Sequence, residues 1–433
     1  MTVSVVRLQD PLESLRRAVM LCDGFAQLRE NHRVLLKPNI PFCFKMPPYG
    51  MVTTTTILDG LSRLLMEHGC TDISIGEGTV ELPGSNTPKG YKWTHIDRLA
   101  RRYGLRLVDL NKGPFQKVDL GGVAVQVCTA AFETDFLINV PVLKTHSQTK
   151  VSLGFKNLKG FLSSSSKTKF HGTGRLNELI CRLNEVIGVD LTVIDGTYVL
   201  EKGPDTVLGT AYRKDLILAS RDAFACDVVG ARIMGIDPSE VGYLREYAIA
   251  HGRSLDPEAI QVRGETNLAP FIETLDWKPD VASELLAPAG IEGLSVPYPG
   301  ESLCSRCYVT LGLALIALIG DNPRTHFEDA LICCGKDVKA QPWAKRILLH
   351  GDCAVKNNAS ISRASRVKGC PPTINRSLIA LSETFLSKPR LLKTIPLRML
   401  KQAGARVGLY SDKLPKWKRY TSADFDRNHF SAA

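Results

Sequence analysis

The chain has 433 residues, of which 44% are hydrophobic and 23% are charged, and this composition is ordinary for a globular protein with room for two or three domains. The formal net charge is +11, but residues 388–433 hold 11 Lys or Arg against three Asp or Glu, so only +3 belongs to the rest of the chain. The basic charge therefore lies mostly in a tail and does not mark the whole chain as a nucleic-acid-binding protein.

The amino-terminal stretch, MTVSVVRLQDPLESLRRAVMLC, has no compact apolar run behind a basic end, so no signal peptide is expected. The longest apolar run, YVTLGLALIALIG at 308–320, is too short to span a bilayer. These features predict a cytoplasmic location. In a reducing compartment, twelve cysteines are better explained as metal ligands or buried thiols than as disulfides.

The first half of the chain alternates strand-like and helix-like patterns. Strands are predicted at RVLLKPNI (33–40), DISIGEG (72–78), DFLINVPVLKTH (135–146) and LTVIDGTYVL (191–200), and a helix at TTTTILDGLSRLLMEHGC (53–70). The segment 215–235 combines a strand with a helix that Asp222 is expected to cap. This alternation predicts an α/β fold with a mainly parallel sheet layered by helices.

Ligands of such folds bind beyond the carboxyl ends of the strands. Polar side chains are predicted to stand there, and we expect them to converge on a small anionic substrate, which lysine binds as a point charge. The alternative for the lysines is a solvated basic loop. Lys144 and His146 are the candidate catalytic residues, with His146 as acid/base or substrate ligand. The candidate substrate-binding residues are Lys37, Asn39, Glu77, Lys156, Asn157 and Asp195. His171 is as compatible with a site role as with a structural one, and SSSS (163–166) is expected to form a mobile loop over the site.

Several ordered motifs resemble the domain-of-unknown-function 362 family: LLKPNI, DISIGEG, PVLKTHSQTKVSLGFKNLKG, VIDGTYVLEKGP and ASRDAFACDVVGARIMGIDP, from residue 33 to about 240. Members of that family often carry an iron–sulfur module, so the resemblance implies one here. The KPN loop and the IGEG strand are also similar to the amino-terminal half of nickel-pincer lactate racemases, from which no residue role is carried over. The chain lacks the C-x2-C-x2-C run of common ferredoxin modules.

The carboxyl-terminal third contains a cysteine pattern typical of a cluster. CSRC places Cys304 and Cys307 in a C-x2-C pair before an apolar helix, while Cys353 and Cys370 each follow a short strand. Four thiolates are the usual ligands of a 4Fe-4S cluster, helix amino termini favour negative charge, and proline follows the last ligand in GCPP. We therefore predict that these four cysteines bind a 4Fe-4S cluster.

Zinc remains the rival, because four-cysteine zinc sites also use C-x2-C pairs. Cys333 and Cys334 are predicted to point to opposite faces of a strand, so one of them could replace an assigned ligand but both could hardly join one site. The other cysteines are expected in the core, with Cys43 near the supposed pocket.

These predictions divide the chain into an α/β domain with the anionic-substrate site (1–295), a smaller cysteine-rich α/β module for the cluster (296–385) and a basic tail (386–433). They favour an iron–sulfur oxidoreductase that passes electrons to the substrate. A nicotinamide cofactor is not indicated, since no G-x-G-x-x-G follows a strand. A metal-dependent lyase or isomerase and a cluster-binding or assembly protein remain the alternatives. The expected partner is an acidic electron carrier such as a ferredoxin or flavodoxin, without nucleic acid. The tail could touch a membrane or pack on the protein itself.

Overall fold

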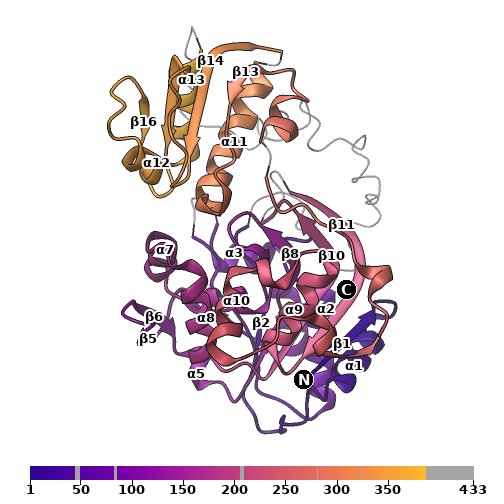
Figure 1. The fold of residues 1–433 in the computed structure, drawn as a ribbon. Coiled ribbons are helices and arrows are strands. Elements are labelled where there is room, and N and C mark those ends of the chain that lie inside the picture. Colours follow the sequence, from indigo (N-terminus) through magenta and orange to yellow (C-terminus); the bar gives the residue numbers. More distant parts are fainter. Residues whose placement is uncertain (44–48, 82–84, 205–208, 280, 323, 387–433) are drawn as a thin grey trace.

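The structure is a computed structural model, and it describes residues 1–43, 49–81, 85–204, 209–279, 281–322 and 324–386. Figure 1 shows a larger α/β body, coloured from indigo to pink, with a smaller orange and yellow part above it. The lower end of the helix α11 (Ser305–Asp321) points from the smaller part toward the body. The predicted fold class, a mostly parallel sheet layered by helices with a smaller carboxyl-terminal module, is confirmed.

The large sheet is mostly parallel, with antiparallel pairs where β11 meets β1 and β10 and where β9 meets β8. Its apolar strands are buried on both faces, as expected for a parallel sheet between helical layers. The spatial order is β12 (Gln261–Gly264), β1 (Thr2–Arg7), β11 (Thr210–Ser220), β10 (Leu191–Glu201), β7 (Phe136–Asn139), β2 (Val34–Lys37), β3 (Ile73–Glu77) and β4 (Arg106–Asp109). β8 (Val142–His146) joins β10 and pairs with β9 (Lys150–Ser152), and a separate hairpin contains β5 (Phe115–Asp119) and β6 (Ala124–Cys128).

Amphipathic helices bury their apolar side chains against the strands. The α-helices of the body are α1 (Pro11–Leu21), α2 (Thr55–Glu67), α3 (Thr87–Trp93), α4 (Ile96–Tyr103), α5 (Ala130–Glu133), α6 (Gly154–Asn157), α7 (Ser164–Gly172), α8 (Leu176–Val186), α9 (Ala223–Ile233) and α10 (Gly242–His251). Short 3-10 turns occur at η1 (Leu158–Phe161), η2 (Pro238–Glu240), η3 (Pro257–Ala259) and η4 (Ala269–Phe271), and a π-helical turn at η5 (Ala282–Leu286). Asp222 caps α9 as predicted, because its carboxylate accepts from the backbone N–H of Ala225 at 2.9 Å.

Two local predictions are wrong. The segment 135–146 forms two strands, because Pro141 has no N–H to extend the ladder and the chain passes from β7 to β8 there. Lys144 and His146 therefore lie within β8 and not in a loop beyond it. The SSSS segment also differs from the predicted loop: Ser163 accepts from the backbone N–H of Ser166 and caps α7, so the serines begin a helix.

The smaller part has a parallel sheet in the order β13 (Glu292–Ser295), β14 (His326–Cys334), β15 (Arg346–His350) and β16 (Ser365–Val367). It also contains the 3-10 turn η6 (Gly300–Ser302), α11, α12 (Asp352–Asn357) and α13 (Ile374–Phe385). Apolar side chains of α11 and α13 share one continuous cluster with those of α1 and α2 in the body. None of the helices in the described ranges combines the length and apolar character that a membrane span requires.

Candidate functional site

The polar residues of the site gather at the point where the order of the parallel strands reverses. From β2 the chain moves through α2 to β3 on one side, whereas β7 pairs with the other side of β2. Lys37 ends β2 and lies in register with Asn139 at the end of β7. Crevices beyond the carboxyl ends of strands at such a reversal are the usual ligand sites of open α/β sheets.

A buried network of hydrogen bonds supports this point of the sheet. The Lys37 ammonium donates to Glu77 at 2.9 Å and to the Pro38 carbonyl at 2.9 Å. Burial lowers the pKa of Lys37, and the Glu77 carboxylate opposes that shift. Asn157 donates its amide hydrogens to Asn139 and to the carbonyls of residues 37 and 38, and it accepts from Asn39 at 2.9 Å. Lys37 thus links the ends of β2 and β3 below the cavity and supports the site structurally.

Two glycines let the backbone approach this network. A side-chain carbon at Gly160 would lie 2.4 Å from the Glu77 carboxylate and 2.5 Å from the Lys37 ammonium. One at Gly78 would lie 2.2 Å from the Gly160 carbonyl. Only glycine fits either position without displacing backbone or the ion pair.

A cavity of about 160 Å³ lies above the network. Of the predicted site residues, Asn39, Glu77, Lys144, His146, Lys156 and Asn157 line it. Lys37 and Asp195 are not among its lining residues. Asp195 instead accepts from the backbone N–H and the hydroxyl of Thr54, at 2.7 and 2.8 Å, and so holds the start of α2.

The basic side chains of the cavity are largely desolvated. Lys156 donates to the Thr149 hydroxyl at 2.9 Å, and no carboxylate in the described part of the chain forms an ion pair with it or with Lys159. Burial and the charges of Lys159 and Lys144 hold the pKa of Lys156 well below its usual range. Burial, reinforced by Lys167, lowers the pKa of Lys159 to about 7, and burial lowers that of Lys167 to about 8. An anion in the cavity would supply the missing partner for these cations.

Lys144 is the cavity lysine that is held by the loops after β2. Its ammonium donates to the Asn39 side-chain oxygen at 2.5 Å and to the Met51 carbonyl at 2.8 Å. These bonds aim Lys144 across the end of β2 and leave it on the cavity wall.

A chain of hydrogen bonds connects His146 with Lys159. The backbone N–H of Gln148 donates to Nδ1 of His146 at 3.0 Å, so Nε2 of this imidazole carries the hydrogen. The Gln148 side-chain oxygen lies 3.1 Å from Nδ1 of His171, whose Nε2 lies 3.0 Å from the Lys159 ammonium. Burial and the neighbouring lysines hold the pKa values of both histidines well below their usual range, so both are neutral at pH 7.

The four predicted cysteine ligands come together from three segments of the smaller part: the start of α11, the first turn of α12 and the loop after β16. Cys304 stands at the start of α11 and hydrogen-bonds with Cys307 in its first turn. Gly351 packs so closely that a side-chain carbon there would lie 3.1 Å from the Cys307 sulfur. The start of α12, which holds Cys353, is joined to the loop of Cys370 by a hydrogen bond from the Gly369 N–H to the Asp352 carboxylate at 2.8 Å. Burial raises the pKa values of Cys353 and Cys370, and negative charge at Cys304 raises both further.

This donor set suits an iron–sulfur cluster, because a four-iron cluster takes four cysteines and its negative charge would lie at the amino terminus of α11. The cations Arg306 and Lys336 lie close enough to lower the pKa of Cys370. Within the described ranges, no three or more His, Cys, Asp or Glu side chains are arranged to hold a single metal ion. All twelve cysteines are described, and none forms a disulfide.

Cys333 and Cys334 face opposite sides of β14, as predicted. Cys333 packs in an apolar cluster with Leu331 and Leu349, whereas Cys334 belongs to the cluster that includes Cys307. The Cys334 sulfur lies 3.6 Å from Nδ1 of His350. Cys334 is thus the one of the pair that lies beside the candidate ligands.

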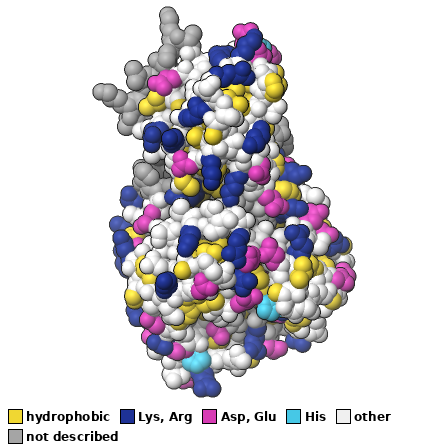
Figure 2. Space-filling view, turned by 60° about the vertical axis from the view of Figure 1, so that its left-hand side comes forward, with side chains coloured by type: hydrophobic (Ala, Val, Ile, Leu, Met, Phe, Trp, Pro, Cys, Tyr) yellow, Lys and Arg dark blue, Asp and Glu magenta, His cyan; other side chains and the backbone are white. Residues whose placement is uncertain are grey.

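The turn between Cys304 and Cys307 forms part of the cavity wall. Ser305 and Arg306, which stand between Cys304 and Cys307, line the cavity together with Val309. Negative charge at Cys304 raises the pKa of Lys159, so these two groups are near neighbours. Nε of Arg306 is buried, and no described residue accepts its hydrogen bond. Figure 2 shows Lys and Arg side chains gathered around the junction between the smaller part and the body.

Sequence reasoning did not assign the residues that join the two parts. Lys159, Lys167 and Arg306 are cavity residues that carried no individual prediction, and Gln148 was not singled out. Arg306 had one available signal, its position inside the C-x2-C pair. The other contacts depend on how α7 meets α11, which no local pattern specifies. Cys43 lies against Ser85 at 3.5 Å and is not among the cavity-lining residues.

Comparisons with known proteins support the family resemblance. Residues 34–232 match the family described as "Domain of unknown function (DUF362)". The chain is 26% identical over 237 residues to the Thylakoid-associated protein sll1697 of Synechocystis sp. (strain ATCC 27184 / PCC 6803 / Kazusa), which covers 53% of this chain and 72% of that protein. The residues that match the family model include β2, β3, β7, β8 and β10 and the basic cavity residues of the larger body.

A solved structure to which part of this chain is similar is the lactate racemase apoprotein from Thermoanaerobacterium thermosaccharolyticum. The two chains have a TM-score of 0.36 and 10% sequence identity, over 55% of this chain and 57% of the racemase chain. This chain therefore spans little more than half of the racemase.

Proposed function

We propose that this protein is a 4Fe-4S oxidoreductase that passes electrons to a small organic anion bound in the cavity between its two parts. The observation that carries the proposal is the position of Arg306. This residue lies between two candidate cluster ligands and lines the same cavity as Lys144, His146 and Lys156. A group bound by the cysteines would therefore adjoin the substrate.

The protein side chains would bind and orient the substrate. Lys156 is best placed to pair with an anionic group, because its hydrogen-bond partner among the described residues is the neutral Thr149 hydroxyl and an anion would favour its charged form. His146 would donate a hydrogen bond from Nε2, since Nδ1 is occupied by the Gln148 N–H. The cluster would supply single electrons.

Reduction of one bond of the substrate takes two electrons and two protons, so two electron deliveries are needed for each turnover. His146 was the expected proton donor, but its lowered pKa makes the neutral imidazole a hydrogen-bond donor instead. Lys159, with a pKa near 7, is better matched to deliver one proton at neutral pH, and the second proton would come from solvent water. His171 accepts from Lys159 and holds its ammonium in place.

The electrons would come from a separate reduced carrier. Cys370 is exposed and Cys353 is half-buried, so the side of the cysteine group that faces away from the cavity is accessible. Four basic residues that flank Cys353 and Cys370 in sequence are exposed: Lys356, Arg363, Arg366 and Lys368. A small acidic ferredoxin or flavodoxin is the partner that such a surface would attract.

The experiment is an anaerobic reoxidation assay on the full-length protein. The cluster is reduced with dithionite, excess reductant is removed, and candidate organic acids are added while the visible absorbance is followed; each substrate molecule would consume the electrons of two reduced clusters. A substrate should reoxidise the cluster rapidly in the wild type and slowly in Lys156→Met, with the iron content of the two proteins equal. Failure of every acid in a broad panel to reoxidise the cluster would contradict an oxidoreductase function.

The exposure of Cys370 also favours a second candidate, a protein that holds a cluster and delivers it to others. That function predicts transfer of iron and sulfide to an apo-ferredoxin without any added substrate. A lyase or isomerase would need an open iron position, which four cysteine ligands do not leave. Conversion of an acid in the absence of any electron donor would identify that class.

Membrane contact through the basic tail is a separate proposal, and residues 387–433 lie outside the described residues. The matched cyanobacterial relative is named for its association with thylakoids. Binding to vesicles that contain anionic lipid, compared between the full chain and a chain ending at residue 386, tests this contact.

A further inference from the structure

The cavity has two chemically different sets of lining residues, and together they point to one class of ligand. We infer that the cavity binds an organic acid with a compact apolar body, its carboxylate held by Lys144, Lys156 and His146 and its body packed against Ile40, Phe42 and Val80. This inference deepens the proposed function, on whose cavity it rests, by naming the substrate class.

The basic residues favour a ligand with an anionic head. Lys156 is buried, its ammonium has the Thr149 hydroxyl as a neutral partner, and Lys144 and His146 stand beside it on the cavity wall. A buried ammonium is unfavourable unless an opposite charge pairs with it. A neutral ligand in the cavity would leave Lys156 without that charge.

The apolar residues require more than a small hydrophilic ion. Ile40, Pro41, Phe42 and Val80 come from the loops after β2 and β3, and Val309 from α11 adds to them. Backbone bonds hold these loops: the Ile40 N–H donates to Glu77 at 2.8 Å and the Val80 N–H to the Pro41 carbonyl at 2.7 Å. Phosphate or acetate would leave these side chains facing water, whereas an apolar body would cover them.

The size of the cavity sets the size of that body. Its volume is about 160 Å³. An apolar cavity of about 150 Å³ accommodates one benzene molecule. A six-membered ring or an aliphatic chain of similar volume would therefore fill the space next to the carboxylate.

The test measures binding of four probes to the full-length, cluster-containing protein in its oxidised state, by isothermal titration calorimetry at pH 7. Benzoate has both the carboxylate and the body, acetate has only the carboxylate, benzyl alcohol has only the body, and inorganic phosphate has charge without a body. Benzoate is expected to bind at least tenfold more tightly than each of the other three.

Variants identify the contacts. Lys156→Met should weaken benzoate binding at least tenfold and remove the preference for benzoate over benzyl alcohol. Val80→Thr, nearly the same shape but polar, should weaken benzoate several-fold and leave acetate unchanged. Lys169→Met is the matched control, because Lys169 is an exposed lysine whose ammonium donates to the Ala124 carbonyl outside this cavity.

The inference is overturned if acetate or phosphate binds as tightly as benzoate, if none of the four probes binds, or if Lys169→Met weakens benzoate as much as Lys156→Met does. The assay uses no electron donor, so its outcome is separate from that of the proposed function. Tight benzoate binding without reoxidation of the cluster by any organic acid would reject the oxidoreductase and keep the ligand class. Reoxidation of the cluster by a purely hydrophilic anion, without tight benzoate binding, would keep the oxidoreductase function and reject the ligand class.

Discussion

Arg306 donates a hydrogen bond from its guanidinium to the hydroxyl of Thr168 at 2.9 Å. Arg306 belongs to the turn between Cys304 and Cys307, and Thr168 belongs to α7, which also contains Lys167 and His171. The backbone carbonyl of His171 in turn accepts from Lys336 of the smaller part at 2.9 Å. These two bonds fasten the cysteine-rich part to the helix that closes the cavity.

Substitution of Gly160 tests the framework beneath the cavity. Gly160→Ala should destabilise the protein by about 1–3 kcal/mol or more, because the new carbon would overlap the buried Lys37–Glu77 pair. Gly172→Ala is the control, since it lies in α7 with no atom within 4 Å of the added carbon, and should be neutral or stabilise by up to about 1 kcal/mol. Chemical denaturation of both variants measures the difference. Equal free energies of unfolding for the two variants would show that the close approach at Gly160 does not contribute to stability.

Anion affinity should fall as pH rises through 7 and 8. Lys159 and Lys167, with pKa values of about 7 and about 8, lose their charge in this window when the cavity is empty, and a bound anion favours their charged forms. Binding of benzoate should therefore take up protons above pH 7, which calorimetry in two buffers of different ionisation enthalpy measures. Lys167→Met should remove the part of the proton uptake near pH 8. Proton release on binding would contradict this assignment.

The same shifts predict a rise in the stability of the ligand-free protein above neutral pH. The unfolded chain keeps its lysines protonated up to about pH 10.4, whereas the folded protein releases these two protons near pH 7 and 8. Because the unfolded state then holds more protons, the free energy of unfolding increases with pH across this interval. Below pH 7 both lysines are charged in the folded protein, and their burial then lowers the free energy of unfolding by its full amount.

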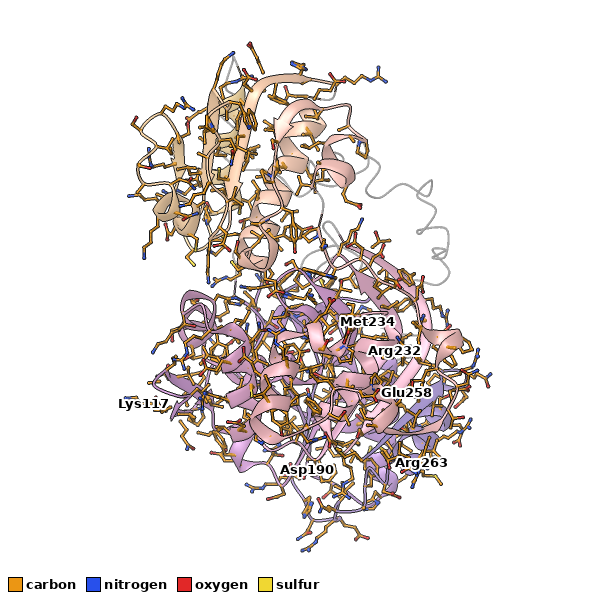
Figure 3. All side chains as sticks on the ribbon, viewed as in Figure 1. Lys117, Asp190, Arg232, Met234, Glu258 and Arg263 are labelled. Atoms are coloured by element: carbon orange, nitrogen blue, oxygen red, sulfur yellow. The ribbon has the colours of Figure 1, made fainter. Side chains whose placement is uncertain are left out.

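Electron delivery by an acidic carrier should depend on salt and on the exposed basic residues near Cys370. Raising the ionic strength should slow reduction of the cluster by a ferredoxin, because exposed charges are screened within a Debye length of ~8 Å at physiological salt. Reversing Arg363 and Lys368 to Glu should slow it further, by about tenfold at low salt. Lys117→Glu is the control, since Figure 3 shows Lys117 on the larger body, far from the smaller part. Stopped-flow rates that respond to neither salt nor these reversals would eliminate this partner.

Local patterns in the sequence were sufficient for most of the framework. The strands at β2, β3 and β10 and the helix α2 follow the apolar periodicity that predicted them. Pro141 was a visible signal for dividing the segment 135–146, but the apolar run on both sides of it outweighed that signal. The serines at 163–166 lack strong helix propensity, and their capping geometry became evident only in the structure.

The candidate site was less predictable, for a physical reason. Lys37 resembles a ligand-binding lysine in sequence, but it is fully buried and paired with Glu77, a contact between residues 40 positions apart. The cavity itself arises where α7 meets the start of α11, about 140 residues later in the chain. Such long-range packing has no local pattern, so the meeting of Arg306 and Lys159 at one cavity could not be predicted beforehand.

The cysteine assignment predicts different outcomes for neighbouring thiols. Single Ala variants of Cys304, Cys307, Cys353 and Cys370 should each lose most of the iron and the brown absorbance. Cys333→Ala should keep both, because Cys333 packs on the opposite face of β14 from the candidate ligands. Cys334→Ala decides whether this thiol, which lies beside Cys307, replaces one of the four. Retention of full iron by all four variants would refute the assignment.

The most direct test of the central claim is the metal and sulfide content of the full-length protein purified without oxygen. The arrangement of Cys304, Cys307, Cys353 and Cys370 predicts about four iron and four acid-labile sulfide per chain, with an electron paramagnetic resonance signal after reduction by dithionite. Zinc as the bound metal, or a protein that contains neither iron nor sulfide, would contradict a cluster beside the cavity.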